Sequence, residues 1–148
     1  MRKIVSTFSI LAMLFVLTAC PYSAEFSLDS PKERINSSYI GTWSEESSFE
    51  NPAYFVISKK DANAYVFEKN EYSTEKKLYE KKTYTGHITT LGNVQFLNLK
   101  DEEENKYYFH KIELSSDKKQ IIMFEVTDNI DEKFSNSVEL KAFFDKYK

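Results

Sequence analysis

Short runs of aromatic and β-branched residues, separated by polar turns, extend from residue 39 to residue 127 and restrict what this chain can fold into. Several runs alternate apolar and polar side chains, and turn residues such as Asp61-Ala62-Asn63 and Gly92-Asn93 separate them. Alternation of this kind between turn signals is typical of half-buried β-strands. We predict strands over residues 39–44, 53–58, 64–69, 78–91, 93–100, 106–114 and 120–127, with 78–91 as one bent strand or two. About seven strands with short connections predict an all-β antiparallel meander, closed into a barrel or folded as a sandwich.

The alternation also assigns side chains to the interior of the predicted sheet. Successive side chains of a strand point to opposite faces, so every second residue faces the core. The sets that we expect to face the core are Tyr108, His110, Ile112 and Leu114 in one strand and Ile122, Phe124 and Val126 in another. Between Phe96 and Leu97 the apolar residues change face, which predicts a β-bulge at this point.

The last residues of the chain have a helical period. Asn136 can cap a helix that starts near Ser137, and Glu139 follows it by three residues, as in a capping box. The apolar stripe of this helix, at spacings of three and four, is Leu140, Phe143, Phe144 and Tyr147. We expect it to pack on the sheet; a membrane-surface helix is the alternative, and acidic residues on the polar face argue against it.

The N-terminus has the organisation of an export signal. Arg2 and Lys3 precede a mostly apolar segment over residues 4–17, which is too short to span a membrane and ends in Leu17-Thr18-Ala19-Cys20. This ending resembles the signal peptide of bacterial lipoproteins. The resemblance implies cleavage before Cys20 and acyl chains, palmitate among them, on its sulfur and new amino group. An ordinary signal peptide with an unrelated cysteine and an uncleaved membrane anchor are the alternatives.

The resemblance also implies a location and a division of the chain. A lipid on Cys20 places the protein at the cell membrane, facing the periplasm, and Pro21 in place of Asp favours the outer membrane in a Gram-negative cell. We predict a signal peptide over residues 1–19, a polar tether over 20–38 and a barrel-like domain over 39–148. A short helix beginning near Ser30-Pro31 is the alternative for part of the tether.

Composition excludes several classes of partner and site. The 23 acidic residues outnumber the 20 basic ones, two of which lie in the signal, and this argues against a nucleic-acid partner. Once Cys20, the only cysteine, carries lipid, the chain has no thiol for a disulfide or a thiolate metal site. We therefore expect no metal and no cofactor.

Gly41-Thr42-Trp43, at the start of the predicted sheet, resembles the first strand of the lipocalins. The resemblance implies that Trp43 closes one end of a barrel whose interior holds a small apolar ligand. A plain role of Trp43 in core packing is the alternative.

The remaining candidate residues are the histidines and two lysine pairs. His110 lies on the apolar face of its strand beside Tyr108, whereas His87 alternates with threonines and is expected to face solvent. Lys76-Lys77 and Lys81-Lys82 are interpreted as an exposed strand face. The chain has no motif of a serine nucleophile, a metalloprotease or a phosphate-binding loop.

These observations predict a lipid-anchored protein of the cell envelope that acts as a non-enzymatic binding or interaction module. The expected partners are the membrane, through Cys20, and either a small apolar ligand or an envelope protein. Trp43, Tyr108 and His110 are the candidate ligand-binding residues of the interior. A lipocalin-like carrier is the alternative function, and an envelope hydrolase that uses His110 is a third.

Overall fold

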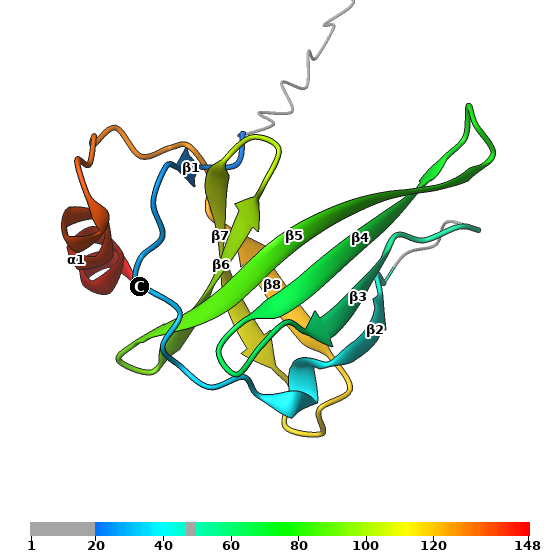
Figure 1. Cartoon of the computed structure of the whole chain (residues 1–148), viewed down its shortest axis with the longest axis horizontal. Helices are drawn as coiled ribbons and strands as arrows, with labels where there is room; N and C mark the ends of the chain where they lie inside the picture. Colours follow the sequence, from blue (N-terminus) through cyan, green and yellow to red (C-terminus); the bar gives the residue numbers. More distant parts are fainter. Residues whose placement is uncertain (1–19, 47–49) are drawn as a thin grey trace, which may run out of the picture.

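The computed structural model describes residues 20–46 and 50–148, so the predicted signal peptide lies outside the described residues (Figure 1). The strands are β1 Ser23–Ala24, β2 Gly41–Ser44, β3 Tyr54–Lys59, β4 Tyr65–Ser73, β5 Leu78–Leu91, β6 Val94–Asp101, β7 Lys106–Leu114 and β8 Ile121–Glu125. A short 3₁₀ helix, Ser37–Tyr39, precedes β2, and one α-helix, α1 (Ser137–Tyr147), follows the sheet. The prediction of a mainly β chain with one C-terminal helix is confirmed.

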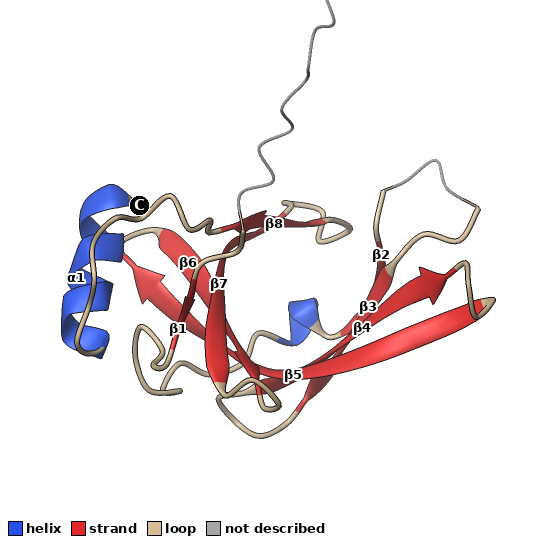
Figure 2. Ribbon diagram, turned by 90° about the horizontal axis from the view of Figure 1, so that it is seen from above, coloured by secondary structure: helices blue, strands red, loops and turns tan. Residues whose placement is uncertain are grey.

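All strands belong to one antiparallel sheet with the order β1-β7-β6-β5-β4-β3-β2, and β8 also pairs with β7. From β2 to β8 each strand pairs with the next one along the chain, which is the predicted meander. The sheet curls strongly, but among the described residues no pairing joins β8 to β2 and closes it (Figure 2). We call this gap between β2 and β8 the seam.

β5 is one long strand that connects the two halves of the sheet. Its first part pairs with β4 up to Gly86, and its last part pairs with β6 from Thr85 onward. Gly86 lies where these two pairings meet, and a Cβ atom there would lie 2.8 Å from the ring of Phe67 and 3.1 Å from Leu99. Glycine at this point therefore lets the inner side chains pack directly against the backbone of β5.

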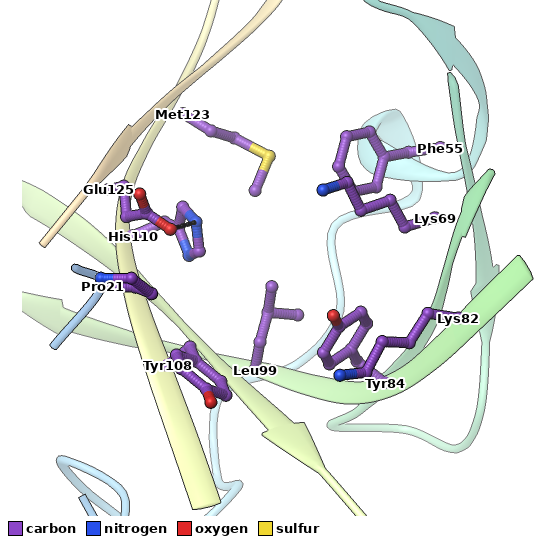
Figure 3. Close-up of a pocket in the computed structure, with 10 residues that line it drawn as sticks. All are labelled: Pro21, Phe55, Lys69, Lys82, Tyr84, Leu99, Tyr108, His110, Met123 and Glu125. Carbon is purple, nitrogen blue, oxygen red and sulfur yellow. Dashed lines mark ion pairs between the residues drawn. The ribbon is translucent and has the colours of Figure 1, made fainter. Parts of the chain in front are cut away.

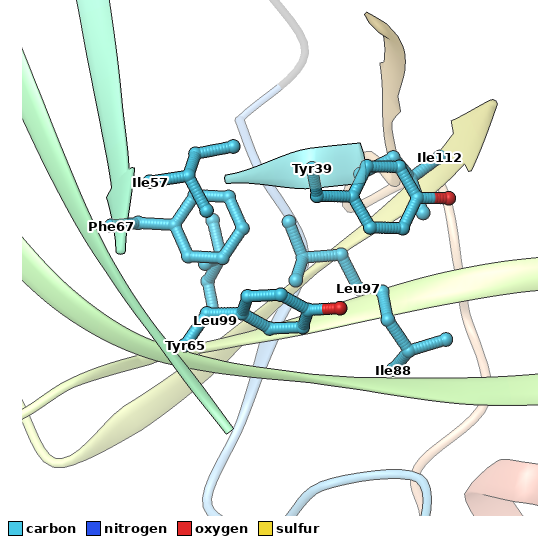
Figure 4. Packing of buried hydrophobic residues seen from close by; sticks show 8 residues of the cluster. All are labelled: Tyr39, Ile57, Tyr65, Phe67, Ile88, Leu97, Leu99 and Ile112. Atoms are coloured by element: carbon cyan, nitrogen blue, oxygen red, sulfur yellow. The ribbon is translucent and has the colours of Figure 1, made fainter. Parts of the chain in front are cut away.

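The inner face of the curled sheet carries the first of two hydrophobic cores (Figure 4). Its buried members come from β3 to β7 and from the 3₁₀ helix: Tyr39, Ile57, Tyr65, Phe67, Ile88, Leu97, Leu99 and Ile112. The second core lies on the outer face of β6 and β7, under the helix: Leu28, Leu91, Phe96, Phe109, Leu140 and Phe144. β6 and β7 are consequently buried on both faces.

Burial on both faces explains why the predicted bulge between Phe96 and Leu97 is wrong. The register of β6 against β5 runs without interruption from Leu91↔Val94 to Thr85↔Lys100. Phe96 belongs to the outer core and Leu97 to the inner core, so both are buried in a regular strand.

The predicted inner face of β8 is also wrong. Ile121 and Met123 pack against the inner core, whereas Ile122 and Phe124 are 44% and 51% exposed. The pairing Met123↔Ile112 sets this face, because directly opposed residues of an antiparallel pair lie on the same side of the sheet.

The segment over residues 20–38, predicted as a tether, instead lies against the sheet. Pro21 forms an antiparallel bridge with Thr127, and the backbone N–H of Tyr22 donates to the carbonyl of Val126 at 2.8 Å. β1 then pairs with β7, and the buried Leu28 enters the outer core. No helix begins at Ser30. We call residues 21–29 the N-terminal strap.

The helix α1 forms as its sequence predicts. The side chain of Asn136 accepts from the N–H of Glu139 at 3.0 Å, and the Glu139 carboxylate accepts from the N–H of Ser135 at 2.9 Å. Leu140 and Phe144 are buried against the sheet, whereas Tyr147 is exposed. Among the described helices, none has the length and apolar character needed to cross a membrane.

Candidate functional site

A cavity of about 280 Å³ lies on the inner side of the curled sheet, between β3–β5 on one wall and β6–β8 on the other (Figure 3). We call it the inner pocket. Its apolar surface comes from Phe55, Tyr84, Leu99 and Met123, and Pro21 of the N-terminal strap lies at its edge. The pocket is slightly smaller than the ~300–1,000 Å³ of typical small-molecule sites and shares their mainly apolar lining.

His110 of β7 points into this pocket, as the sequence predicts, and its side chain is only 16% exposed. Its Nδ1 atom is buried without a hydrogen-bond partner among the described residues. Burial, together with the nearby charge of Lys69, lowers the pKa of His110 to about 4. The ring is therefore neutral at pH 7 and offers one donor and one acceptor.

Glu125 is the carboxylate that faces His110. Its Oε1 atom lies 3.9 Å from His110 Nε2. This exceeds the ~2.6–3.2 Å that a hydrogen-bonded acid–base pair requires. The two side chains line one pocket without forming a catalytic pair in this structure.

Tyr108 also lines the inner pocket, and its hydroxyl already donates a hydrogen bond within the protein. It donates to the carboxylate of Glu104, and this hydrogen bond is the main reason why the pKa of Tyr108 rises to about 12. Tyr108 therefore contributes the face of its ring to the pocket rather than a reactive phenolate.

Two lysines of the pocket were not among the residues selected from the sequence. Lys69 in β4 and Lys82 in β5 both line the inner pocket. Lys82 was interpreted as part of an exposed strand face; in the structure its Nζ atom lies 2.6 Å from the buried Asp101, and this interaction raises the pKa of Lys82. A signal for this position was present in the sequence. In β4, Lys69 shares a face with Tyr65 and Phe67, and in β5, Lys82 shares a face with Tyr84, so alternation could have placed both lysines on the inner face.

Trp43 lies outside the inner pocket, in a groove of about 630 Å³ along the seam. We call it the seam groove; Ile57 and Ile121 also line it. The indole N–H of Trp43 donates to the carbonyl of Tyr39 at 2.9 Å, which fixes the ring. Phe55 and Met123 border both the seam groove and the inner pocket, so the two hollows adjoin each other.

His87 does not face solvent, contrary to the sequence-based expectation. It is buried, and its Nε2 donates to the carbonyl of Asp29 at 2.7 Å. Burial lowers the pKa of His87 and favours the neutral ring. The N-terminal strap covers this part of the outer face. The alternation within β5 cannot predict this burial, because the covering residues belong to a distant part of the chain.

Metal ligation has no candidate within residues 20–46 and 50–148, where no group of three or more His, Cys, Asp and Glu side chains could hold an ion. Cys20, at the start of the described chain, is exposed. Comparisons with protein-family models, with curated proteins and with solved structures found no match to this chain.

Proposed function

We propose that this chain is a lipid-anchored, outer-membrane protein of the cell envelope that binds a small, mainly apolar ligand in its inner pocket without catalysis. The observation that carries the proposal is the position of Pro21, which borders the pocket and directly follows Cys20. Acyl chains on Cys20 would therefore hold the pocket against a membrane surface. This function combines the binding module predicted from the sequence with the lipocalin-like carrier.

The inner pocket favours binding over hydrolysis. Its walls are mostly apolar, and the hydroxyl of Tyr108 is bonded to Glu104. His110 has no hydrogen-bonded carboxylate to orient it, because Glu125 lies 3.9 Å away. A hydrolase of the His-dependent kind orients its base through such a bond.

A protein partner is the second candidate, and the outer side of β8 favours it. Ile122 and Phe124 are exposed side by side on one face of this edge strand, and Lys111 of the neighbouring β7 lies over the Phe124 ring. Exposed apolar groups with a charged neighbour are common at protein–protein interfaces. This surface and the inner pocket lie on opposite faces of β8 and can act independently.

The anchor is tested by Cys20→Ser. We expect the variant either to remain as the uncleaved precursor or to move from the detergent-rich to the aqueous phase, because neither lipid addition nor the cleavage that depends on it can occur. Phase partitioning and the mass of the N-terminal peptide measure this. Glu25→Gln, an exposed change five residues away, is the control and should remain anchored. A correctly cleaved, membrane-bound Cys20→Ser protein would contradict the anchor.

The ligand is tested by filling the inner pocket. The protein is purified with its anchor, and small molecules are extracted with organic solvent and identified by mass spectrometry. We expect a bound molecule at close to equimolar amount in the wild type and in Phe124→Trp, whose side chain is exposed on the outer side of β8. It should be lost in Met123→Trp, where the indole occupies the pocket. Equal amounts from the two variants would rule out this pocket as the binding site.

A further inference from the structure

Two lysines face each other inside the inner pocket. Lys69 and Lys82 are directly opposed partners of β4 and β5, on the face that also carries Phe67 and Tyr84. Opposed residues of this kind have Cβ atoms about 4.5–5.5 Å apart, and like charges there destabilise the pair. The fold thus gathers positive charge at one place in a mostly apolar interior.

The two ammonium groups are neutralised to very different degrees. Lys82 contacts Asp101, a buried carboxylate whose other oxygen accepts from the N–H groups of Glu103 and Glu104 at 2.9 and 3.1 Å. Lys69 pairs at 2.7 Å with Glu71, whose side chain is 62% exposed. Exposed ion pairs contribute only about 0–1 kcal/mol. A ligand can therefore recruit Lys69 with little loss, whereas Lys82 is held in place.

The wall opposite Lys69 supplies a second polar group. Figure 3 shows Lys69 extending its Nζ into the pocket on the side that faces His110. The buried Nδ1 of His110 has no partner among the described residues, and its Nε2 lies 3.9 Å from Glu125, beyond hydrogen-bond distance, so the ring has an unused N–H to offer a ligand. Glu125, half exposed, lies on the far side of His110 from Lys69 in this view, so its carboxylate does not stand between the two groups.

The remainder of the pocket suits a hydrocarbon. Leu99 forms the floor, and Phe55 and Met123 lead from the inner pocket into the seam groove. Trp43 and Ile121 then line the groove on its two sides. A chain that starts between Lys69 and His110 would therefore meet apolar side chains from Leu99 through Phe55 and Met123 to Trp43 and Ile121. Charged residues such as Glu45 and Lys119 also line the groove.

We propose that the ligand is an amphiphile with a single anionic head group, held between Lys69 and His110, and an apolar tail that passes Phe55 and Met123 toward the seam. This inference rests on the proposed function and names the ligand class of the same pocket. The head group needs no metal, because an ammonium and an imidazole N–H supply the charge-assisted bonds.

The test uses the full-length protein in vesicles of its own membrane and two photoreactive probes. Both are the same straight hydrocarbon chain with a diazirine at the far end; one has a carboxylate head and the other a hydroxyl head. Lys69→Gln removes the ammonium, and Lys69→Arg keeps the charge. Lys111→Gln is the matched control: Lys111 is also a half-exposed strand lysine paired with the glutamate two residues on, but it lies over Phe124 on the outer face.

We expect the carboxylate probe, whose diazirine lies at the tail end, to label residues of the seam groove in the wild type, in Lys69→Arg and in Lys111→Gln. Labelling should fall about tenfold in Lys69→Gln, as loss of one charge-assisted hydrogen bond predicts. The hydroxyl probe should label all four proteins weakly and equally. The same probe is compared between variants, so its partition into the vesicle does not affect the result.

Two results would overturn the inference and have different consequences. If Lys69→Gln is labelled like the wild type, or both glutamine variants lose labelling equally, the head-group site is wrong and the apolar pocket of the proposed function stands. If neither probe labels residues of the seam groove or the inner pocket in any of the four proteins, the inference is wrong, and the co-purification experiment decides separately whether another ligand occupies the pocket.

Discussion

Replacing Phe144 by alanine is expected to lower the free energy of unfolding by about 3–5 kcal/mol. Phe144 is buried, and its ring packs edge-on against Phe96 at 5.2 Å and Phe109 at 5.3 Å between ring centroids. The substitution leaves a cavity between α1 and the outer face of β6 and β7. Urea denaturation followed by far-UV circular dichroism measures the loss.

Val138→Ala is the control for this measurement, because Val138 belongs to the same helix and is exposed. It should change stability by less than about 0.5 kcal/mol. A loss below about 1 kcal/mol for Phe144→Ala would mean that α1 does not contribute to the core. The sheet would then be stable with its outer face uncovered.

Asn98→Ala is expected to cost about 3 kcal/mol and to loosen the N-terminal strap. Asn98 is fully buried; its Oδ1 accepts from the N–H of Leu28 at 2.8 Å, and its Nδ2 donates to the Thr89 hydroxyl at 3.0 Å. Alanine leaves these groups buried without partners, at about 1–3 kcal/mol for each. Hydrogen exchange should show faster exchange of the amides over residues 22–28.

The comparison variant is Asn129→Ala, which removes an exposed asparagine next to the end of the sheet. It should leave both the unfolding midpoint and strap exchange unchanged. If Asn98→Ala loses stability while strap exchange stays as in the wild type, Asn98 supports only the sheet, and the strap is held by its other contacts.

The meander and the helix could be predicted because each of their signals is local. Alternation between turns identifies β3 to β8, and the cap at Asn136 with the stripe that contains Leu140 and Phe144 identifies α1. Strand β1 and the 3₁₀ helix escaped prediction because segments of two and three residues are too short to show a period. They owe their conformation to contacts with β7 and Tyr65 rather than to their own sequence.

Faces were harder to predict than strands. Alternation shows which residues share a face, and it identifies the buried face only where one side of the sheet meets solvent. Here α1 and the N-terminal strap cover the outer side of β6 and β7, so Phe96 and Leu97 are both buried in an unbulged strand. Ile122 and Phe124 were placed inside because they are apolar, but pairing with β7 turns Met123 inward instead.

Part of the candidate site could be predicted from the sequence. His110 and Tyr108 do line one pocket, because they share a face of β7, whereas Trp43 lies in the adjoining seam groove. Lys69 and Lys82 were not selected, since a charged residue in a strand is usually exposed. Only the register Lys69↔Lys82 brings them together on the inner face, and a register between distant segments is not a property of either strand alone.

The bridge between Pro21 and Thr127 leaves no flexible linker between Cys20 and the folded domain. A flexible chain as long as residues 20–38 would let its end wander over roughly 25 Å. Instead the carbonyl of Cys20 accepts from the N–H of Asp128 at 2.9 Å, so the domain begins at the very residue that would be tethered. With Cys20 held at a surface, the domain would therefore stay close to that surface. It would then meet what diffuses along that surface more readily than what lies far from it.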